Sequence, residues 1–368
     1  MEVYHINNIE EIDTPALVVF RGVVEENIHT TIEQIGDVSR LRPHVKTHKS
    51  PDVTRMLMKK GVSKFKCATI AEAEMLGECG AEDVLLAYPL IGPKIDRFLD
   101  LMEKFPETRF SCLTDYLIPA TQIAEKAVKR KMIVSVYVDI NSGMNRTGLL
   151  PDQTAVELIK TIVEVPGLQF EGLHVYDGHI GQKNLAERRE VCIREFAQIE
   201  ELKVRLEEDG IKGRIVAGGS PTFPIYAREY DEVEASPGTF VFWDRGYQEK
   251  LPEQDLRPAA VVLTRVISKT GVDRYCLDLG HKSIAAENPL DRRVYFPGFP
   301  DLQFISQSEE HLVVQTPEGV DWEIGEILTG IPIHICPTVA LYEEMKVVKN
   351  GQYKDLWSVR ARVRKITV

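Results

Sequence analysis

Three polar side chains alternate along one short segment near the N-terminus, Leu41-Arg-Pro-His-Val-Lys-Thr-His-Lys49. If this segment forms a β-strand, Arg42, His44 and Lys46 point to the same face, because successive strand side chains alternate. Burial lowers the pKa of a lysine, and a neutral amine is the form that attacks an aldehyde to give an imine. Taken alone, the segment also fits a solvated basic turn, which is the commoner setting for lysine and histidine.

Two glycine-containing turns further along the chain could hold a phosphate group. Residues 217–222 are Ala-Gly-Gly-Ser-Pro-Thr, and residues 235–239 are Ala-Ser-Pro-Gly-Thr. Glycine allows a close approach of the backbone to an anion, and Ser220, Thr222 and Thr239 add hydroxyl groups. In (β/α)8 barrels, phosphate sites are commonly built from the loops after strands seven and eight. The two turns fall there when the lysine segment is counted as strand one, although each turn alone also fits a plain loop.

A histidine and a cysteine stand two residues apart near the C-terminal end, at positions His334 and Cys336. On a strand predicted over residues 331–335, positions i and i+2 share a face, so an imidazole nitrogen and a thiolate could bind the same ion. Nitrogen together with sulfur favours zinc over magnesium or calcium, and two protein ligands leave room for water or substrate. The alternative is a buried cysteine beside a hydrogen-bonded histidine.

Three further histidines, His48, His179 and His281, are candidates for a general acid or base because imidazole titrates near neutral pH. His179 ranks first, because it lies close to the C-terminal end of a predicted barrel strand. His281 ranks second and lies in the segment Leu279-Gly-His-Lys282. Each of these histidines also fits a structural hydrogen-bonding role.

Short β-branched runs alternate with longer amphipathic segments up to about residue 236, which is the pattern of repeated βα units. Nine strands are predicted, over residues 15–20, 40–45, 64–69, 83–88, 109–113, 132–139, 170–176, 214–218 and 232–236. A closed barrel takes eight strands, so the first one is expected to leave the barrel and pair elsewhere. After about Arg257 the chain changes to strand-like runs with turns. We therefore expect an α/β fold, with a (β/α)8 TIM-type barrel over residues 13–256 and a β-rich domain over residues 257–368 that also takes in residues 1–20.

The composition is that of an acidic globular protein, with 43% hydrophobic and 27% charged residues and a formal net charge of −11 over 368 residues. This charge gives no electrostatic reason to expect binding to nucleic acid or to an anionic membrane. The N-terminus has no signal-peptide pattern, and no segment reaches the roughly 20 apolar residues of a membrane span. A cytoplasmic protein is therefore expected. The six cysteines are scattered without a CxxC pair, as is typical of reduced thiols.

Several motifs occur together in this chain: Asp13-Thr-Pro15, the segment 42–49, and the run Val138-Asp-Ile-Asn-Ser-Gly-Met-Asn-Arg-Thr-Gly148. Together they resemble the fold-type III enzymes that use pyridoxal 5′-phosphate (PLP), whose alanine racemase branch has a similar Asp-x-Gly-Met-Asn-Arg-x-Gly stretch. The chain is more similar to the D-threonine aldolase and D-serine dehydratase branch, through residues 42–49, His174-Val-Tyr-Asp-Gly-His179 and His334-Ile-Cys336. The resemblance spans residues 13 to about 342.

The resemblance implies a role for individual residues. Lys46 would carry PLP as a Schiff base, Arg146 would contact the 3′-oxygen of the ring, and Tyr176 would lie against the ring. A structural salt bridge is the alternative for Arg146. His44, on the strand face of Lys46, is counted with the cofactor-binding residues, and the phosphate would be held by Gly218, Gly219, Ser220, Gly238 and Thr239. His334 and Cys336 would hold a divalent metal, with zinc favoured and manganese as an alternative, while Lys46, His179 and His281 would be catalytic.

The reaction expected first is a PLP- and metal-dependent retro-aldol cleavage of D-β-hydroxy amino acids to glycine and an aldehyde, of the D-threonine aldolase type. The alternatives are a D-serine or D-3-hydroxyaspartate dehydratase, a racemase, and a non-enzymatic PLP-homeostasis protein. The β-rich region and the His334/Cys336 pair argue against the last. Aldolases of this branch often have aspartate at the second metal position, whereas Cys336 resembles the D-serine dehydratases. By analogy with fold-type III relatives, a homodimer with a small D-amino acid substrate is expected.

Overall fold

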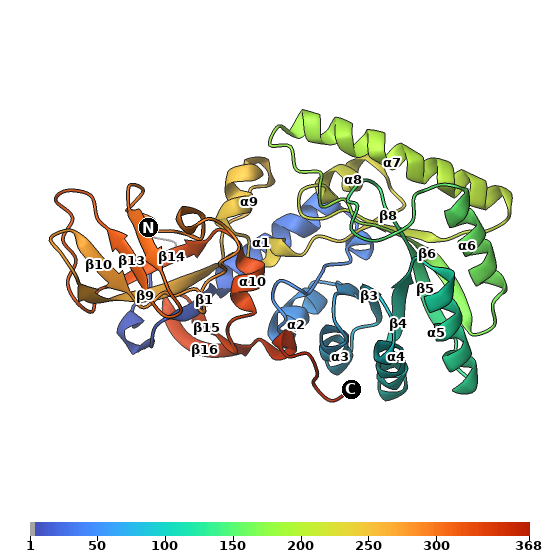
Figure 1. The fold of residues 1–368 in the computed structure, drawn as a ribbon, viewed down its shortest axis with the longest axis horizontal. Coiled ribbons are helices and arrows are strands. Elements are labelled where there is room, and N and C mark those ends of the chain that lie inside the picture. The colour runs from blue at the N-terminus through green and yellow to red at the C-terminus, as the bar shows by residue number, and fades with distance from the viewer. Residues whose placement is uncertain (1–3) are drawn as a thin grey trace. The chain divides into compact units, whose positions relative to one another are not determined.

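The computed structural model describes residues 4–368, and the chain forms two compact units (Figure 1). The barrel unit comprises residues 31–46, 54–238 and 363–368. The β-rich unit comprises the described residues 4–30 together with 47–53 and 239–362. The chain therefore passes from one unit to the other directly after Lys46 and again after Gly238.

The barrel unit is built on a seven-stranded parallel sheet with the order β2-β3-β4-β5-β6-β7-β8. Its strands are β2 (Lys64–Cys67), β3 (Asp83–Pro89), β4 (Arg109–Thr114), β5 (Val134–Ile140), β6 (Leu168–Val175), β7 (Arg214–Ala217) and β8 (Val233–Ala235). Residues 41–45 connect the two edges of this sheet. Arg42 N–H donates to the carbonyl of Ala235 at 2.9 Å, and Val45 N–H donates to the carbonyl of Lys66 at 2.9 Å. The segment occupies the eighth strand position, so the predicted barrel is confirmed.

The closing segment is less regular than the strand predicted over residues 40–45. A short 3-10 turn, Val38–Arg40, precedes it. Pro43 has no N–H to donate, so only two isolated β-bridges remain of the ladder. The carbonyl of Pro43 still accepts a hydrogen bond from Lys66 N–H at 2.9 Å. The segment therefore stays paired with β2 up to the position of Lys46.

The amphipathic segments between the strands of the barrel unit form five helices, which lie on the outside of its sheet in Figure 1. They are α3 (Ile70–Glu78), α4 (Pro93–Lys104), α5 (Leu117–Lys129), α6 (Gln153–Glu164) and α7 (Leu185–Glu208). The short α8 (Phe223–Glu229) precedes β8, and α1 (Arg21–Ile35) and α2 (Pro51–Lys59) each cross a unit boundary. Several helices begin with a side-chain cap. Before α6, the carboxylate of Asp152 accepts a hydrogen bond from Thr154 N–H at 2.9 Å. None of the helices in the described part of the chain is long and apolar enough to cross a bilayer.

The interior of the barrel is charged at the N-terminal ends of its strands. The side chain of Arg42 is 0% exposed and forms salt bridges with Asp83 at 2.6 Å and Glu234 at 2.8 Å. The next layer is apolar and consists of Leu85, Leu113, Tyr137 and Val216. Because these two layers fill the barrel, the remaining inward polar groups lie toward the C-terminal ends of the strands, where sites in such barrels are built.

The β-rich unit contains a nine-stranded sheet whose main path is β12-β13-β10-β9-β1-β15-β16, with β14 pairing with β9 and β11. Its strands are β1 (Ala16–Phe20), β9 (Ala260–Lys269), β10 (Arg274–Leu277), β11 (Val294–Tyr295), β12 (Gln303–Gln307), β13 (Leu312–Gln315), β14 (Ile327–Pro332), β15 (Glu344–Lys349) and β16 (Gln352–Ser358). β1 pairs antiparallel with β9 and parallel with β15. The first predicted strand therefore leaves the barrel, as expected.

The strand predicted over residues 331–335 is wrong at its end. β14 ends at Pro332, and α10 (Ile335–Val339) begins directly after His334, which is its N-cap residue. Pro337 is tolerated in the first turn of α10 because its missing N–H would have no partner within the helix. Cys336 therefore lies on a helix rather than on a strand. Another short helix of this unit, α9 (Arg245–Lys250), precedes β9.

Candidate active site

Two of the predicted cofactor-binding residues converge on the aromatic ring of a third in the barrel unit. The Nζ atom of Lys46 lies 5.7 Å from the centroid of the Tyr176 ring, and the Cζ atom of Arg146 lies 4.7 Å from it. Lys46 is partly buried, and it ends the closing segment of the barrel. Tyr176 follows β6 directly, and Arg146 lies in the loop after β5. The fold therefore brings together side chains that are far apart in the sequence.

The loop that carries Arg146 is folded back onto the end of β5. Asp139 accepts two of the hydrogen bonds that hold it: Thr147 Oγ1 donates to the carboxylate at 2.7 Å, and Leu149 N–H donates to the main-chain carbonyl at 3.0 Å. Asn141 Oδ1 accepts from the backbone N–H of Asn145 at 3.0 Å. These bonds fix both ends of the loop, so the guanidinium of Arg146 is held against Tyr176 although Arg146 is exposed to solvent.

A second lysine, Lys66 on β2, faces the same ring and was missed from the sequence. Its Nζ atom lies 5.7 Å from the Tyr176 centroid and donates a hydrogen bond to Ser236 Oγ. Burial lowers the pKa of the Lys66 ammonium to about 7, and the positive charge of Lys46 acts in the same direction. Period-2 alternation from Lys64 along the predicted strand could have identified Lys66 as inward-facing.

A buried histidine–aspartate pair lies at the ends of β5 and β6 and was also missed. His174 is 3% exposed, and its Nδ1–H donates to Asp139 Oδ1 at 2.7 Å. Burial lowers the pKa of His174, which favours the neutral imidazole. Burial alone would raise the pKa of Asp139, but the hydrogen bonds from His174 and Thr147 and the nearby positive charge together outweigh it, and the pKa is lowered. The Nε2 atom of His174 has no hydrogen-bond partner among residues 4–368.

The turn after β7 has a backbone conformation that requires glycine at its first position. Gly218 has a φ of +76°, and a Cβ atom there would lie 2.8 Å from Tyr226 Cδ2, so only glycine fits. The ends of β7 and β8 are joined by Ser236, whose Oγ–H donates to the carbonyl of Gly218 at 2.9 Å. Gly219 and Ser220 follow in the same turn, and Gly238 ends the barrel unit two residues after Ser236.

Two residues predicted to bind the cofactor, His44 and Thr239, make contacts with other groups of the protein. The ring of His44 supports the backbone of Lys46, because its Nδ1 accepts the Lys46 N–H at 3.2 Å. Thr239 belongs to the β-rich unit, where its Oγ1 lies 3.6 Å from Cys336 Sγ. Their roles in cofactor binding remain predictions.

The three candidate acid–base histidines occupy different surroundings. In the barrel unit, His179 is exposed, and its Nε2–H donates to Glu195 Oε2 on α7 at 2.6 Å. In the β-rich unit, His281 lies in a turn after β10, where it is exposed to solvent near Glu309. His48 is fully buried, which lowers its pKa to about 3 and makes it a poor proton carrier near neutral pH.

The predicted metal-binding pair lies at the start of α10 in the β-rich unit. The side chains of His334 and Cys336 interact directly, although the residues lie at the start of a helix and not on the predicted strand. The Nδ1–H of His334 donates to Glu287 Oε1 at 2.6 Å, and Cys336 Sγ lies 3.1 Å from Thr47 Oγ1. A carboxylate on one imidazole nitrogen is the usual support of a metal-binding histidine, and it leaves Nε2 available. No group of three or more His, Cys, Asp or Glu side chains suited to a metal occurs within residues 4–368.

The residues of the barrel unit fit PLP. The cofactor needs an amine for its aldehyde, an aromatic face for its ring, cations for its anionic oxygens and a glycine turn for its phosphate. Lys46, Tyr176, Arg146 and the turn at Gly218 supply these groups. The unpartnered, buried Nε2 of His174 is a further sign that a polar ligand belongs there, because buried polar atoms in folded proteins are normally hydrogen-bonded.

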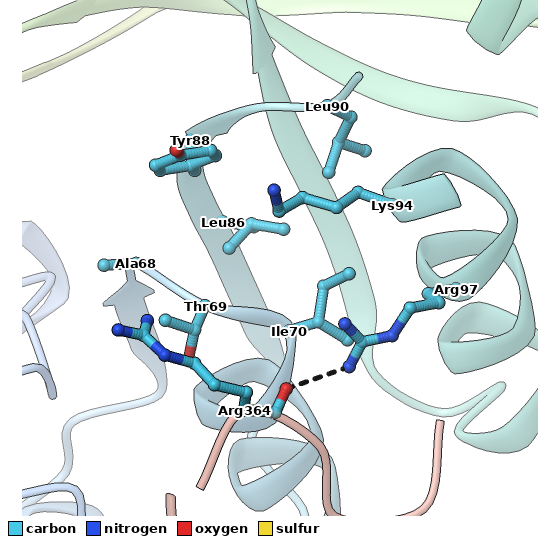
Figure 2. A pocket seen from close by; sticks show the side chains of 9 residues that line it. All are labelled: Ala68, Thr69, Ile70, Leu86, Tyr88, Leu90, Lys94, Arg97 and Arg364. Carbon is cyan, nitrogen blue, oxygen red and sulfur yellow. Dashed lines mark hydrogen bonds between the residues drawn. The ribbon is translucent and has the colours of Figure 1, made fainter. Parts of the chain in front are cut away.

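A separate basic pocket of the barrel unit lies beside the start of α3 and the end of β3 (Figure 2). Lys94 and Arg97 on α4 and Arg364 near the C-terminal end line it together with apolar side chains. Arg97 donates to the main-chain carbonyl of Arg364 at 3.1 Å, as Figure 2 shows. None of the predicted site residues lines this pocket, so it is distinct from the group around Tyr176.

Comparison with known proteins identifies relatives along nearly the whole chain. The family model for the N-terminal domain of alanine racemase matches residues 21–245, and a putative serine dehydratase domain matches residues 259–348. D-threonine aldolase from an Arthrobacter species is 29% identical over 362 residues, which cover 96% of this chain and 94% of that protein. D-threo-3-hydroxyaspartate dehydratase from Delftia sp. strain HT23 is 27% identical over 372 residues, which cover 94% of this chain and 97% of that protein.

Solved structures show the same architecture. D-threonine aldolase from Filomicrobium marinum has a TM-score of 0.87 at 25% identity, covering 95% of both chains. The Delftia dehydratase has a TM-score of 0.82 at 20% identity, covering 97% of this chain and 99% of that one. The same dehydratase has been solved with a histidine replaced by alanine, and, in a metal-free form, with a cysteine two positions further on replaced by alanine. The chain therefore belongs to the alanine racemase N-terminal domain family, within the fold-type III PLP-dependent enzymes.

Proposed function

We propose that this protein is a PLP-dependent lyase that cleaves D-β-hydroxy amino acids to glycine and an aldehyde, as a D-threonine aldolase does. The observation that carries the proposal is the convergence of Lys46 and Arg146 on the ring of Tyr176, beside the glycine turn after β7. The similarity to D-threonine aldolases over nearly the full length of the chain, in sequence and in structure, supports the aldolase reaction.

Each residue of the candidate site in the barrel unit has a role that follows from its chemistry. Bound PLP would supply the electron sink for the bond that breaks at the substrate Cα. The amine of Lys46 holds the cofactor by its aldehyde, the face of Tyr176 orients the flat ring, and Arg146 places a positive charge beside an anionic oxygen. The buried Asp139–His174 pair presents a neutral imidazole Nε2 as a hydrogen-bond acceptor, because its Nδ1–H is donated to the carboxylate.

A divalent metal would be held by His334 and Cys336 and would stabilise negative charge on the β-oxygen of the substrate. Glu287 orients the His334 ring through Nδ1, which suits a metal-binding histidine. Zinc is favoured by the nitrogen and sulfur donors, with manganese as the alternative. His179, supported by Glu195, is the first candidate for the general base, and His281 is the second.

A second candidate function, dehydration of D-serine or D-3-hydroxyaspartate, is favoured by one observation. The spacing of His334 and Cys336 matches the histidine and cysteine that were replaced in the solved dehydratase variants, of which the cysteine variant was solved in a metal-free form. A dehydratase would use the same parts differently: Lys46 would take the Cα proton, and a metal held by His334 and Cys336 would supply a Lewis acid for the leaving hydroxide.

The products of D-threonine, D-serine and D-threo-3-hydroxyaspartate decide between the two reactions. The purified protein would be incubated with each substrate, and aldehyde with glycine would be assayed against 2-oxo acid with ammonia. L-Threonine serves as the stereochemical control, and Lys46→Ala as the control without the cofactor lysine. Aldehyde and glycine from D-threonine are expected. Formation of 2-oxo acid alone would contradict the aldolase assignment and leave the dehydratase.

A further inference from the structure

Lys66 is a buried lysine to which neither the motifs nor the proposed reaction assigns a task. The residue is 2% exposed, and its Nζ donates a hydrogen bond to Ser236 Oγ. Its amine lies 5.7 Å from the centroid of the Tyr176 ring, the same distance as the amine of Lys46. The side chain therefore faces the ring on which the predicted cofactor-binding residues converge.

The hydrogen-bond partner of Lys66 sets it apart from the lysine two residues earlier on the same strand. Lys64 forms a salt bridge with the carboxylate of Glu234, whereas Lys66 donates to the neutral hydroxyl of Ser236. Across residues 4–368, no carboxylate forms a salt bridge with Lys66. A charged lysine that is buried without an ion-pair partner is costly, so such an amine either loses its proton or binds an anion.

The groups that face this amine come from several elements of the barrel unit. They are Lys46, Asp139, Arg146, His174 and Asp177. Burial has the largest effect and lowers the pKa of Lys66 to about 7, and the cations act in the same direction against the two carboxylates. Near neutral pH the amine is therefore balanced between its charged and uncharged forms, and a new charge nearby would shift that balance.

The hydrogen bonds around Lys66 indicate that the cofactor phosphate would be the charge that shifts this protonation balance. Ser236, its hydrogen-bond partner, donates its own Oγ–H to the carbonyl of Gly218 at 2.9 Å and its N–H to the carbonyl of Ala217 at 3.1 Å. Lys66 is therefore two hydrogen bonds away from the turn that would hold the cofactor phosphate. An anion within a few ångströms favours the charged form of an amine and raises its pKa.

We propose that Lys66 is a proton-accepting anchor for PLP: its amine is only partly protonated in the empty site near neutral pH and takes up a proton from solvent when the cofactor binds. The resulting ammonium adds a positive charge against the anionic groups of the cofactor. This inference rests on the proposed cofactor site and deepens it. Covalent attachment stays with Lys46, and Lys66 acts in binding alone.

The test measures the binding of pyridoxine 5′-phosphate, which lacks the aldehyde, to the cofactor-free protein at pH 7 and pH 9. Wild type is compared with Lys66→Met, which keeps an unbranched side chain as far as the Cε position without the amine. The control is Lys64→Met, which removes an inward lysine of the same strand that already has a carboxylate partner. Because the ligand ionises identically in every case, its own titration cancels from the ratio of the two Kd values.

The expected result is an affinity advantage of wild type over Lys66→Met that shrinks about 5- to 50-fold from pH 7 to pH 9. The range follows from a free pKa of about 7 and a pKa of 8 or more in the complex. Lys64→Met should keep the pH dependence of wild type. Titration calorimetry in two buffers of different ionisation enthalpy gives a second measure: at pH 8, wild type should take up nearly one proton more per site than Lys66→Met, about 0.9 when the bound pKa is high.

Other results would distinguish an error about Lys66 from an error about the cofactor site. If the ratio of the Kd values of wild type and Lys66→Met changes less than fivefold between pH 7 and pH 9, the proposed role of Lys66 is wrong. If Lys66→Met weakens binding equally at both pH values, Lys66 only supports the end of β8. If wild type binds neither pyridoxine 5′-phosphate nor PLP, the proposed cofactor site itself fails. Proton uptake that is the same in wild type and Lys66→Met also overturns the inference.

Discussion

Replacing Arg42 with methionine should destabilise the barrel unit far more than removing an exposed cation. The Arg42 side chain is 0% exposed and bridges Asp83 at 2.6 Å and Glu234 at 2.8 Å. Removing one partner of a buried ion pair typically costs about 3–5 kcal/mol, because the remaining charges stay buried. Asp83 and Glu234 each keep a second basic neighbour, Arg214 and Lys64 respectively, so we expect about 3 kcal/mol, the lower end of that range.

Lys160→Met is the matched control. Its ion pair with Asp209 spans 2.7 Å, nearly the distance of the Arg42 pair, but the two side chains are 45% and 40% exposed. Exposed pairs contribute about 1 kcal/mol or less, so the control reports the cost of losing a cation whose carboxylate partner stays in solvent.

Urea unfolding followed by far-UV circular dichroism measures this difference, because most of the long helices belong to the barrel unit. With a slope of about 3 kcal/mol/M, a loss of 3 kcal/mol lowers the midpoint by about 1 M. The three tryptophans, Trp243, Trp322 and Trp357, all lie in the β-rich unit, so their fluorescence reports that unit separately. A midpoint for Arg42→Met no lower than that of Lys160→Met would refute the reasoning.

Three further changes test other parts of the structure. Gly178→Ala should weaken PLP binding about tenfold, because the added Cβ would lie 2.5 Å from Tyr176 Oη and displace the ring; unchanged affinity in a spectral titration would contradict this. The pKa of Asp83 is lowered because hydrogen bonding and the charge of its arginine partner outweigh burial. Its stabilisation is therefore present above the unfolded pKa of about 3.9 and is lost as pH falls through the lower folded value. Asp83→Asn should accordingly lose less unfolding free energy than wild type between pH 4 and pH 2, measured by urea titration, and parallel losses would count against it. Wild type should retain a divalent metal after dialysis, and His334→Ala and Cys336→Ala should each lose it; equal metal content in all three proteins by elemental analysis would contradict a metal site at this pair.

The features that the sequence predicted correctly are those with local signals. Helices such as α5 and α7 follow from amphipathic periodicity, and β1 was expected outside the barrel because a closed barrel holds only eight strands. The motifs that carry Lys46, Arg146 and Tyr176 lie at the C-terminal ends of strands, and the structure places the three side chains together, while their roles toward the cofactor stay predictions. These positions depend on one strand or one loop each.

The features that were missed depend on contacts between distant segments. Lys66 and Ser236 are 170 positions apart, so only the closed barrel shows that they are paired. The Asp139–His174 pair likewise needs the register of β5 against β6. The strand predicted through His334 failed for a local reason, because the backbone turns into α10 directly after β14. Short apolar runs do not distinguish a strand end from a short helix.

The covalent attachment of PLP to Lys46 is tested most directly by reducing the purified, PLP-loaded protein with borohydride and mapping the modified peptide. The choice of residue is meaningful because two lysines, Lys46 and Lys66, lie at the same 5.7 Å from the Tyr176 ring. We predict that the reduced adduct is found on the peptide that contains Lys46 and is absent from the Lys46→Ala variant. An adduct on Lys66, or an undiminished adduct in Lys46→Ala, would contradict the assignment of the cofactor lysine.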